Sequence, residues 1–172
     1  MVREIYRGRI VNLRVERVTL PNGVAVDLEL MHHPGASAVV AADDAGQVVL
    51  IRQYRHAAGG YIWEVPAGVL GPDEPPAACA ARELEEEAGV VASDLRHLGT
   101  MFTTPGFCDE RIHLFLARGL RETALAHEAD EAIAEIARIP LDRALGMIRA
   151  GEIVDGKTIA GLYLAADALR AA

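Results

Sequence analysis

The stretch from Gly68 to Val90, GVLGPDEPPAACAARELEEEAGV, constrains the fold more than any other part of the chain. Its second half predicts a helix that begins near Asp73 or Glu74 and ends at Gly89. Asp73 is a suitable N-cap, the Pro-Pro pair after Glu74 suits a first helical turn, and Gly89 suits the left-handed position after a helix. We therefore expect a short, rigid helix between two turns.

Three glutamates are expected on one side of this helix. At about 100° per residue, Glu83, Glu86 and Glu87 fall within an arc of roughly 100°, whereas Glu85 points to the far side. Arg82 precedes Glu86 by one turn and is close enough to pair with it. An adjacent stripe of small apolar residues is expected to pack on a sheet: Ala77, Ala80, Ala81, Leu84 and Ala88. A rigid row of carboxylates is a suitable support for hard divalent cations.

A glutamate-rich helix face is, by itself, ordinarily a solvated surface. Like charges one turn apart cost only about 0.2–0.5 kcal/mol when exposed, so these glutamates alone do not require a metal. The complete spacing is far more specific. It runs Gly68, five residues, Glu74, seven residues, Arg82-Glu83-Leu84, one residue, Glu86-Glu87, one residue, Gly89-Val90. This spacing resembles, without a departure, the signature of the Nudix hydrolases.

The rest of the composition excludes several classes of protein. A chain of 172 residues is long enough for one domain with a substantial core. The net charge of −8 argues against a general grip on nucleic acid, which needs clustered cations. No apolar run approaches the 18 residues of a membrane helix, and the first ten residues contain no apolar core of a secretion signal. Cys79 and Cys108 form no CxxC pair, so we expect free thiols and a cytoplasmic protein.

Alternating apolar residues predict an N-terminal hairpin. Residues 10–32 alternate on both sides of Pro21-Asn22-Gly23, which is a turn signal. With a short segment around Tyr6, this hairpin is expected to form a small antiparallel β subdomain over residues 1–34. The main domain is then expected over residues 35–172.

The main domain is predicted to mix strands and helices without regular alternation. Strands are expected at 36–42 and 47–54, paired around Asp43-Asp44-Ala45-Gly46, and at 62–65, 95–102, 111–117 and 133–139. A helix is expected over 141–150, and Asp155 is expected to cap a final helix to about residue 171. This order predicts an α+β layer structure.

Two short stretches beside the glutamate helix are candidates for ligand contacts. Arg52-Gln53-Tyr54-Arg55 ends a strand, and its ordinary interpretation is an edge strand with solvated arginines. If this strand abuts the helix, Arg55 is better placed than Arg52 to reach a phosphate. Gly68 permits an unusual backbone angle, which would aim the Ala67 carbonyl at a cation.

Two loops are weaker candidates. Pro105-Gly106 marks a loop that is ordinarily a simple connection between strands. The acidic segment His127-Glu128-Ala129-Asp130-Glu131 is ordinarily solvated, but a mobile carboxylate there would be able to take a proton from water. The other histidines show no metal-ligand spacing and are assigned to surface or strand positions.

The resemblance extends beyond the glutamate helix. The order RQYR, EVPAG, the 23-residue signature, and TPGF with DER is similar to the ADP-ribose pyrophosphatase branch of the Nudix family. Pro105 lies sixteen residues beyond Gly89, as is typical of that branch. The resemblance implies an αβα sandwich with a mixed sheet. It also implies hydrolysis of ADP-ribose to AMP and ribose 5-phosphate with two or three Mg²⁺ or Mn²⁺ ions, and a homodimer that shares its N-terminal strands.

The resemblance also implies roles for individual residues. The metal ligands would be the Ala67 carbonyl, Glu83, Glu86 and Glu87, while Gly68, Glu74, Arg82 and Gly89 would shape the motif. Substrate contacts would come from Arg52, Arg55, Met101, Gly106 and Glu110. Glu86 would take part in catalysis, and the general base would be Glu131, with Glu128 close behind. Alternative substrates are GDP-mannose, another nucleotide sugar or a dinucleotide, and a non-catalytic nucleotide sensor is the alternative outside the enzymes.

Overall fold

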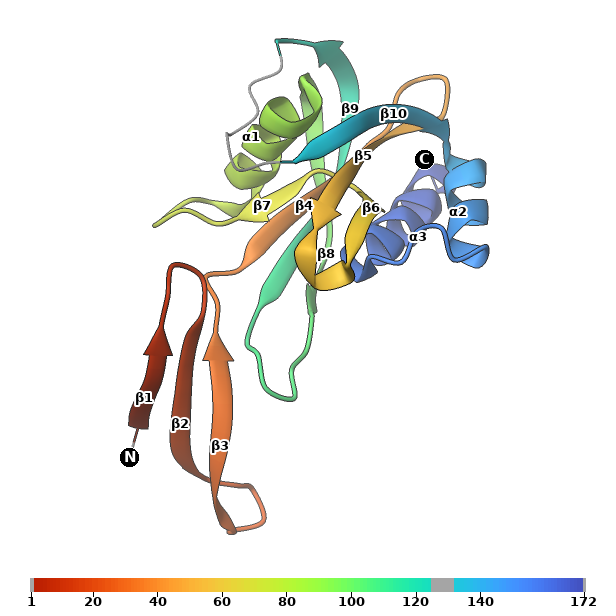
Figure 1. Cartoon of the computed structure of the whole chain (residues 1–172). Helices are drawn as coiled ribbons and strands as arrows, with labels where there is room; N and C mark the ends of the chain where they lie inside the picture. Colours follow the sequence, from red (N-terminus) through yellow and green to blue (C-terminus); the bar gives the residue numbers. More distant parts are fainter. Residues whose placement is uncertain (1, 125–131, 172) are drawn as a thin grey trace.

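The computed structural model describes residues 2–124 and 132–171 of the chain. The N-terminal part is a three-stranded antiparallel sheet in the order β1-β2-β3, formed by β1 (Val2–Arg7), β2 (Asn12–Thr19) and β3 (Ala25–His32). The predicted turn joins β2 and β3, and Gly23 adopts the positive φ of +85° that this turn requires. This sheet projects from the rest of the molecule (Figure 1).

The main body contains two further sheets. One has the order β10-β5-β6 and is formed by β5 (Gln47–Arg55), β6 (Gly60–Glu64) and β10 (Ile133–Pro140). The other has the order β7-β4-β9-β8 and is formed by β4 (Ala36–Ala41), β7 (Ala67–Val69), β8 (Val90–Phe102) and β9 (Arg111–Glu122). A short 3₁₀ turn, η1 (His56–Ala58), links β5 to β6. The sequence did not predict β7.

Helices cover both sides of these sheets, as Figure 1 shows. Helix α1 (Pro76–Ala88) lies on one side, and α2 (Leu141–Arg149) and α3 (Gly156–Arg170) lie on the other. Neighbouring residues of β4 pack against helices on opposite sides of the sheet, because side chains alternate along a strand. Val39 packs with α1, and Val40 packs with α3. The result is the expected α+β sandwich with helices outside and strands inside.

The predicted pairing of the strands on either side of Asp43 is wrong. Both strands exist and the turn forms, with the Asp43 carboxylate accepting the N–H groups of Ala45 and Gln47. However, β4 and β5 belong to different sheets, and Ala42, just after β4, forms an isolated bridge with Val48. Strand β4 instead runs parallel to β9 and antiparallel to β7. The turn therefore sends the chain from one sheet to the other.

Two expectations for α1 also need correction. The N-cap is Pro75, without a side-chain hydrogen bond, and Asp73 instead has a positive φ of 56° in the preceding turn. Within the expected apolar stripe Ala77 and Ala81 are exposed, and Cys79 is buried in addition to Ala80, Leu84 and Ala88. The C-terminal end is as predicted, since Gly89 is left-handed with φ 63°.

The other helix boundaries agree closely with the expectations. The Asp155 carboxylate caps α3 by accepting the N–H of Thr158 at 3.0 Å. This cap brings the first turn of α3 to the edge of β6, where the Thr158 hydroxyl accepts the N–H of Val65. Within the described ranges, no helix is long and apolar enough to cross a membrane.

Candidate active site

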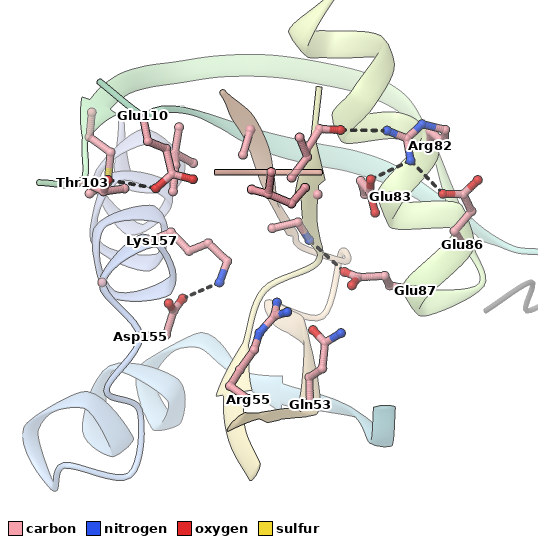
Figure 2. A pocket seen from close by; sticks show the side chains of 18 of the residues that line it. Gln53, Arg55, Arg82, Glu83, Glu86, Glu87, Thr103, Glu110, Asp155 and Lys157 are labelled. Carbon is pink, nitrogen blue, oxygen red and sulfur yellow. Dashed lines mark hydrogen bonds and ion pairs between the residues drawn. The ribbon is translucent and has the colours of Figure 1, made fainter. Parts of the chain in front are cut away.

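A cavity of about 860 Å³ lies between α1, the ends of β5 and β7, the first turn of α3, and the connection from β8 to β9. Figure 2 shows the carboxylates of α1 on one side of this cavity and Arg55, Gln53 and Lys157 on the other. Elements far apart in sequence therefore meet here. Among the expected site residues, those lining the cavity are Arg55, Ala67, Gly68, Arg82, Glu83, Glu86, Glu87, Met101 and Glu110.

The predicted carboxylate face of α1 is present. Glu83 and Glu87 are buried, Glu86 is half-buried, and all three line the cavity. The Glu87 carboxylate accepts the N–H of Ala67 at 2.8 Å, which fixes it beside β7. Glu85 is exposed on the other side, where its carboxylate accepts the hydroxyl of Thr123 at 3.3 Å. The helical period alone thus sorted these four glutamates correctly.

Arg82 connects the carboxylates to the turn before the helix. Its guanidinium donates to Glu83 at 2.6 Å and to Glu86 at 2.9 Å. It also donates twice to Glu74, at 2.9 Å and 3.0 Å, and Glu74 accepts the N–H of Gly71 as well. The hydrogen bonds from Arg82 and Gly71 lower the pKa of Glu74 to about 2. One arginine therefore fixes both the entering turn and two carboxylates of the face.

Gly68 has a different function from the one expected. Its φ is not positive, so no unusual backbone angle is involved. Instead, a Cβ built on Gly68 would overlap the Glu83 carboxylate, so glycine is needed for space. Cys79 packs below, with its thiol donating to the Gly68 carbonyl at 3.5 Å, and burial raises the pKa of this thiol to about 11. Cys79 is thus a packing residue.

The opposite wall carries a buried carboxylate with two cations. Glu64, on β6, accepts two hydrogen bonds from Arg55, at 2.9 Å and 2.7 Å, and one from Lys157 at 2.9 Å. Lys157 also contacts the capping Asp155 at 3.1 Å. Burial alone would raise the pKa of Glu64, but the contacts from Arg55 and Lys157 outweigh it and the pKa is lowered. Glu64 therefore holds both cations at the edge of the cavity.

Two residues of this wall were missed in the sequence. Lys157 is the single lysine of the chain and follows a predicted helix cap by two positions, which was an available signal. Gln53 lies inside the RQYR stretch and is buried to 95%, with 5% of its surface exposed. Over residues 2–124 and 132–171, its Oε1 is the one buried side-chain nitrogen or oxygen atom without a hydrogen-bond partner. It lines the cavity as a hydrogen-bond acceptor.

The connection between β8 and β9 supplies the third wall. Thr103, just after β8, donates its hydroxyl to the Glu110 carboxylate at 2.8 Å. Met101 and Glu110 line the cavity, as the sequence led us to expect. Thr103 begins the candidate loop around Pro105-Gly106, but the sequence predicted no role for it.

Other predicted residues are not brought to this cavity. Arg52 is exposed on β5, with its guanidinium 6.0 Å from the centre of the Tyr61 ring, and Gly106 is exposed in the loop after Thr103. Neither lines the cavity in the described structure. The two candidates for the general base, Glu128 and Glu131, lie outside the described residues.

The donor chemistry of α1 fits a hard divalent cation, because carboxylate and carbonyl oxygens are the ligands that Mg²⁺ prefers. Glu83, Glu86, Glu87 and the backbone of Ala67 face one cavity. In the part of the chain that the structure describes, no group of three or more Asp, Glu, His or Cys side chains is arranged as a metal site. Arg82 holds two of the carboxylates. Metal binding by these residues stays a prediction.

The family follows from comparison with known proteins. The family model described as NUDIX domain matches residues 31–162, which is most of the chain. The chain belongs to the NUDIX family. The matched region of this NUDIX protein contains all the cavity walls described above.

Curated relatives and solved structures are similar over nearly the whole length. The NUDIX chain is 40% identical over 156 residues to an ADP-ribose pyrophosphatase of Bacillus subtilis, covering 90% of this chain and 84% of the relative. It is 42% identical to an ADP-ribose pyrophosphatase of Mycobacterium tuberculosis (92% and 77%), and 41% identical to a methanol dehydrogenase activator of Bacillus methanolicus (91% and 85%). A crystal structure of an ADP compounds hydrolase shares the fold, with TM-score 0.85, 23% identity, and coverage of 99% and 92%.

Proposed function

We propose that this NUDIX protein hydrolyses the diphosphate bond of ADP-ribose and releases AMP and ribose 5-phosphate. The observation that carries the proposal is the opposition of two walls in one cavity. Buried carboxylates of α1 face the cations Arg55 and Lys157 on the other side. A diphosphate fits between them, since its oxygens bind cations directly on one side and through a divalent metal on the other. The ADP-ribose pyrophosphatases among the relatives support this substrate.

We assign the metal side to the Ala67 carbonyl, Glu83, Glu86 and Glu87. When bound there, Mg²⁺ or Mn²⁺ would neutralise the diphosphate oxygens and stabilise the leaving phosphate. Arg82 would orient Glu83 and Glu86, because its guanidinium contacts both carboxylates. The number of ions proposed is two or three.

We assign substrate binding to Arg55, Met101 and Glu110, with Gln53 as a further contact. Arg55 reaches the cavity while held on Glu64, so its guanidinium is orientated before a ligand arrives. The buried Gln53 oxygen would accept a hydrogen bond from a ribose hydroxyl. Arg52 and Gly106 remain weaker candidates, since neither lines the cavity in the described part of the chain.

The proton of the attacking water requires an acceptor within hydrogen-bond reach. We assign this step to Glu131 or Glu128 of the acidic segment, with Glu86 as the catalytic carboxylate on α1. The assignment rests on the sequence, because this segment lies outside the described residues.

We further propose a cytoplasmic homodimer that uses the N-terminal sheet, residues 1–34. Large apolar side chains are exposed on this sheet, at Val2, Ile5, Tyr6 and Val24. Such a surface is suited to pairing with a second copy. Two free cysteines, both buried, support a reducing compartment.

The experiment that tests the function is incubation of the purified protein with ADP-ribose and Mg²⁺, followed by chromatography of the products. AMP and ribose 5-phosphate are expected in equal amounts. A panel of GDP-mannose, other nucleotide sugars and dinucleotides run in parallel ranks the substrates. If another compound of the panel is cleaved faster, that compound would be assigned as the substrate in place of ADP-ribose. Tight binding of ADP-ribose without any cleavage would identify a sensor and contradict the proposal.

A further inference from the structure

A histidine joins the N-terminal sheet to the connection that carries Glu110. The ring of His32, the last residue of β3, lies between two carboxylates from different parts of the chain. Its Nδ1 is 2.7 Å from Asp109, in the connection from β8 to β9, and its Nε2 is 2.9 Å from Glu16 on β2. His32 is the only member of this trio that contacts both others, so it bridges the sheet and the connection within the described structure.

This geometry favours the charged form of the ring. A neutral imidazole carries one N–H, so one of its nitrogens would present a lone pair to a carboxylate. Only the imidazolium donates from both nitrogens at once. The hydrogen bonds that the ring donates to Asp109 and Glu16 raise the pKa of His32. The charged groups facing the ring are Glu16 on β2 and Asp109, and the next ones along the chain are His33 and Glu110.

The residue that follows Asp109 in the chain, Glu110, lines the cavity. The Asp109 carboxylate also accepts the backbone N–H of His33 at 2.8 Å. The backbone N–H of Asp109 donates to the Met31 carbonyl, and the Met31 N–H donates to the Phe107 carbonyl. Glu110 is the next residue, and its carboxylate lies in the cavity, held by Thr103 at 2.8 Å. Asp109, which His32 contacts, is therefore the immediate neighbour of the proposed substrate contact Glu110.

We propose that His32 is a positioning residue that, as an imidazolium, holds the connection carrying Glu110 against the N-terminal sheet and so sets the affinity for substrate. The proposal rests on the proposed function only for the identity of the ligand bound near Glu110. His32 does not touch the reacting atoms. Its loss should raise KM and leave kcat nearly unchanged, because it removes binding shared by the ground state and the transition state.

The pH dependence has a defined sign. Because the folded-state pKa of His32 is raised above its ordinary value of 6.5, the bridge is complete below that value and is lost as the pH rises through the raised pKa. KM is therefore expected to increase over that interval. The contacts are partly exposed and screened by solvent, so we expect an increase of about two- to five-fold.

The experiment compares the wild type with Glu16→Gln and His32→Gln. Glu16 lies on β2 and does not line the cavity, so its conservative change alters the ring without touching the site. Two measurements are made: imidazole ¹⁵N NMR titration of the whole protein, and KM and kcat for ADP-ribose between pH 5.5 and 9. His97→Gln is the matched control, since His97 is an exposed histidine on β8 that contacts Thr100.

The expected results separate the two proposals. In the wild type the His32 ring should titrate above pH 6.5, and Glu16→Gln should lower both that pKa and the pH at which KM rises. His32→Gln should show the raised KM at every pH, and His97→Gln should match the wild type. An unchanged KM profile in Glu16→Gln, or a ring that titrates at or below 6.5, would overturn the inference. The NMR titration needs no substrate, so failure to cleave ADP-ribose would count against the proposed function alone.

Discussion

A side chain on Gly68 and the carboxylate of Glu83 would occupy the same space. The two residues come from β7 and α1, and their contact brings the carboxylate face of the helix against the backbone of the cavity. The signature glycine is thus explained by packing distance, since its φ is not positive. This relationship can be tested without removing a charged group.

Gly68→Ala should displace the Glu83 carboxylate while leaving the fold intact. The overlapping atoms are the far end of a flexible side chain, so Glu83 rotates at a cost of about 1 kcal/mol. Because Glu83 is a proposed metal ligand, its displacement is expected to lower kcat/KM for ADP-ribose by about 100-fold. Gly99→Ala is the control, because its Cβ would meet only Leu164 at an ordinary 3.7 Å. Equal activity of the two variants would show that the position of Glu83 is unimportant.

Glu74→Gln should remove an acid-sensitive part of the stability. The folded-state pKa of Glu74 is about 2, against an ordinary value of 4.5, so its contribution is complete above about pH 4.5 and is lost as the pH falls toward 2. Thermal unfolding from pH 7 to pH 2 measures this. The Tm difference from the wild type should be largest near pH 7 and disappear near pH 2. A Tm difference that stays constant with pH would contradict the assigned cause. The control variant Glu152→Gln, at an exposed position, should have the same Tm as the wild type at every pH.

Glu64→Gln should destabilise the protein, because it leaves Arg55 and Lys157 without their shared carboxylate. Only 2% of the Glu64 side chain is exposed, whereas Arg55 is partly exposed. In the variant, Lys157 would retain its ion pair with Asp155. We expect a loss of about 2–3 kcal/mol in the free energy of unfolding, measured with urea. Asp44→Asn, which breaks an exposed pair with Arg118, should cost less than about 0.5 kcal/mol. Equal costs would show that burial of Glu64 contributes nothing.

The parts of the site that lie on one helix could be predicted from sequence. Helical geometry is local, so the period alone placed Glu83, Glu86 and Glu87 together and Glu85 apart. The same holds for Gly89 and Asp155, whose roles depend on residues within one turn. The turn at residues 21–23, which joins β2 to β3, likewise depends on neighbouring residues in the sequence.

The remaining features depend on contacts between distant segments. The turn at Asp43 has the chemistry of a hairpin, yet β4 pairs with β9 because both are buried between two helix layers. Lys157 reaches Glu64 only because α3 packs beside β6, which no local pattern reports. Likewise, the bridge from Glu16 through His32 to Asp109 joins three segments of the chain, and no local sequence pattern indicates it.

The most direct measurement of the central claim compares the turnover of ADP-ribose by Glu87→Gln and Glu85→Gln at saturating Mg²⁺. Both changes remove one charge from the same helix, but Glu87 is buried in the cavity and Glu85 is exposed on the far side. If the carboxylate face of α1 supports hydrolysis, kcat should fall by about 100- to 1000-fold in Glu87→Gln. Glu85→Gln should retain nearly all activity. Comparable kcat values in the two variants would contradict the account.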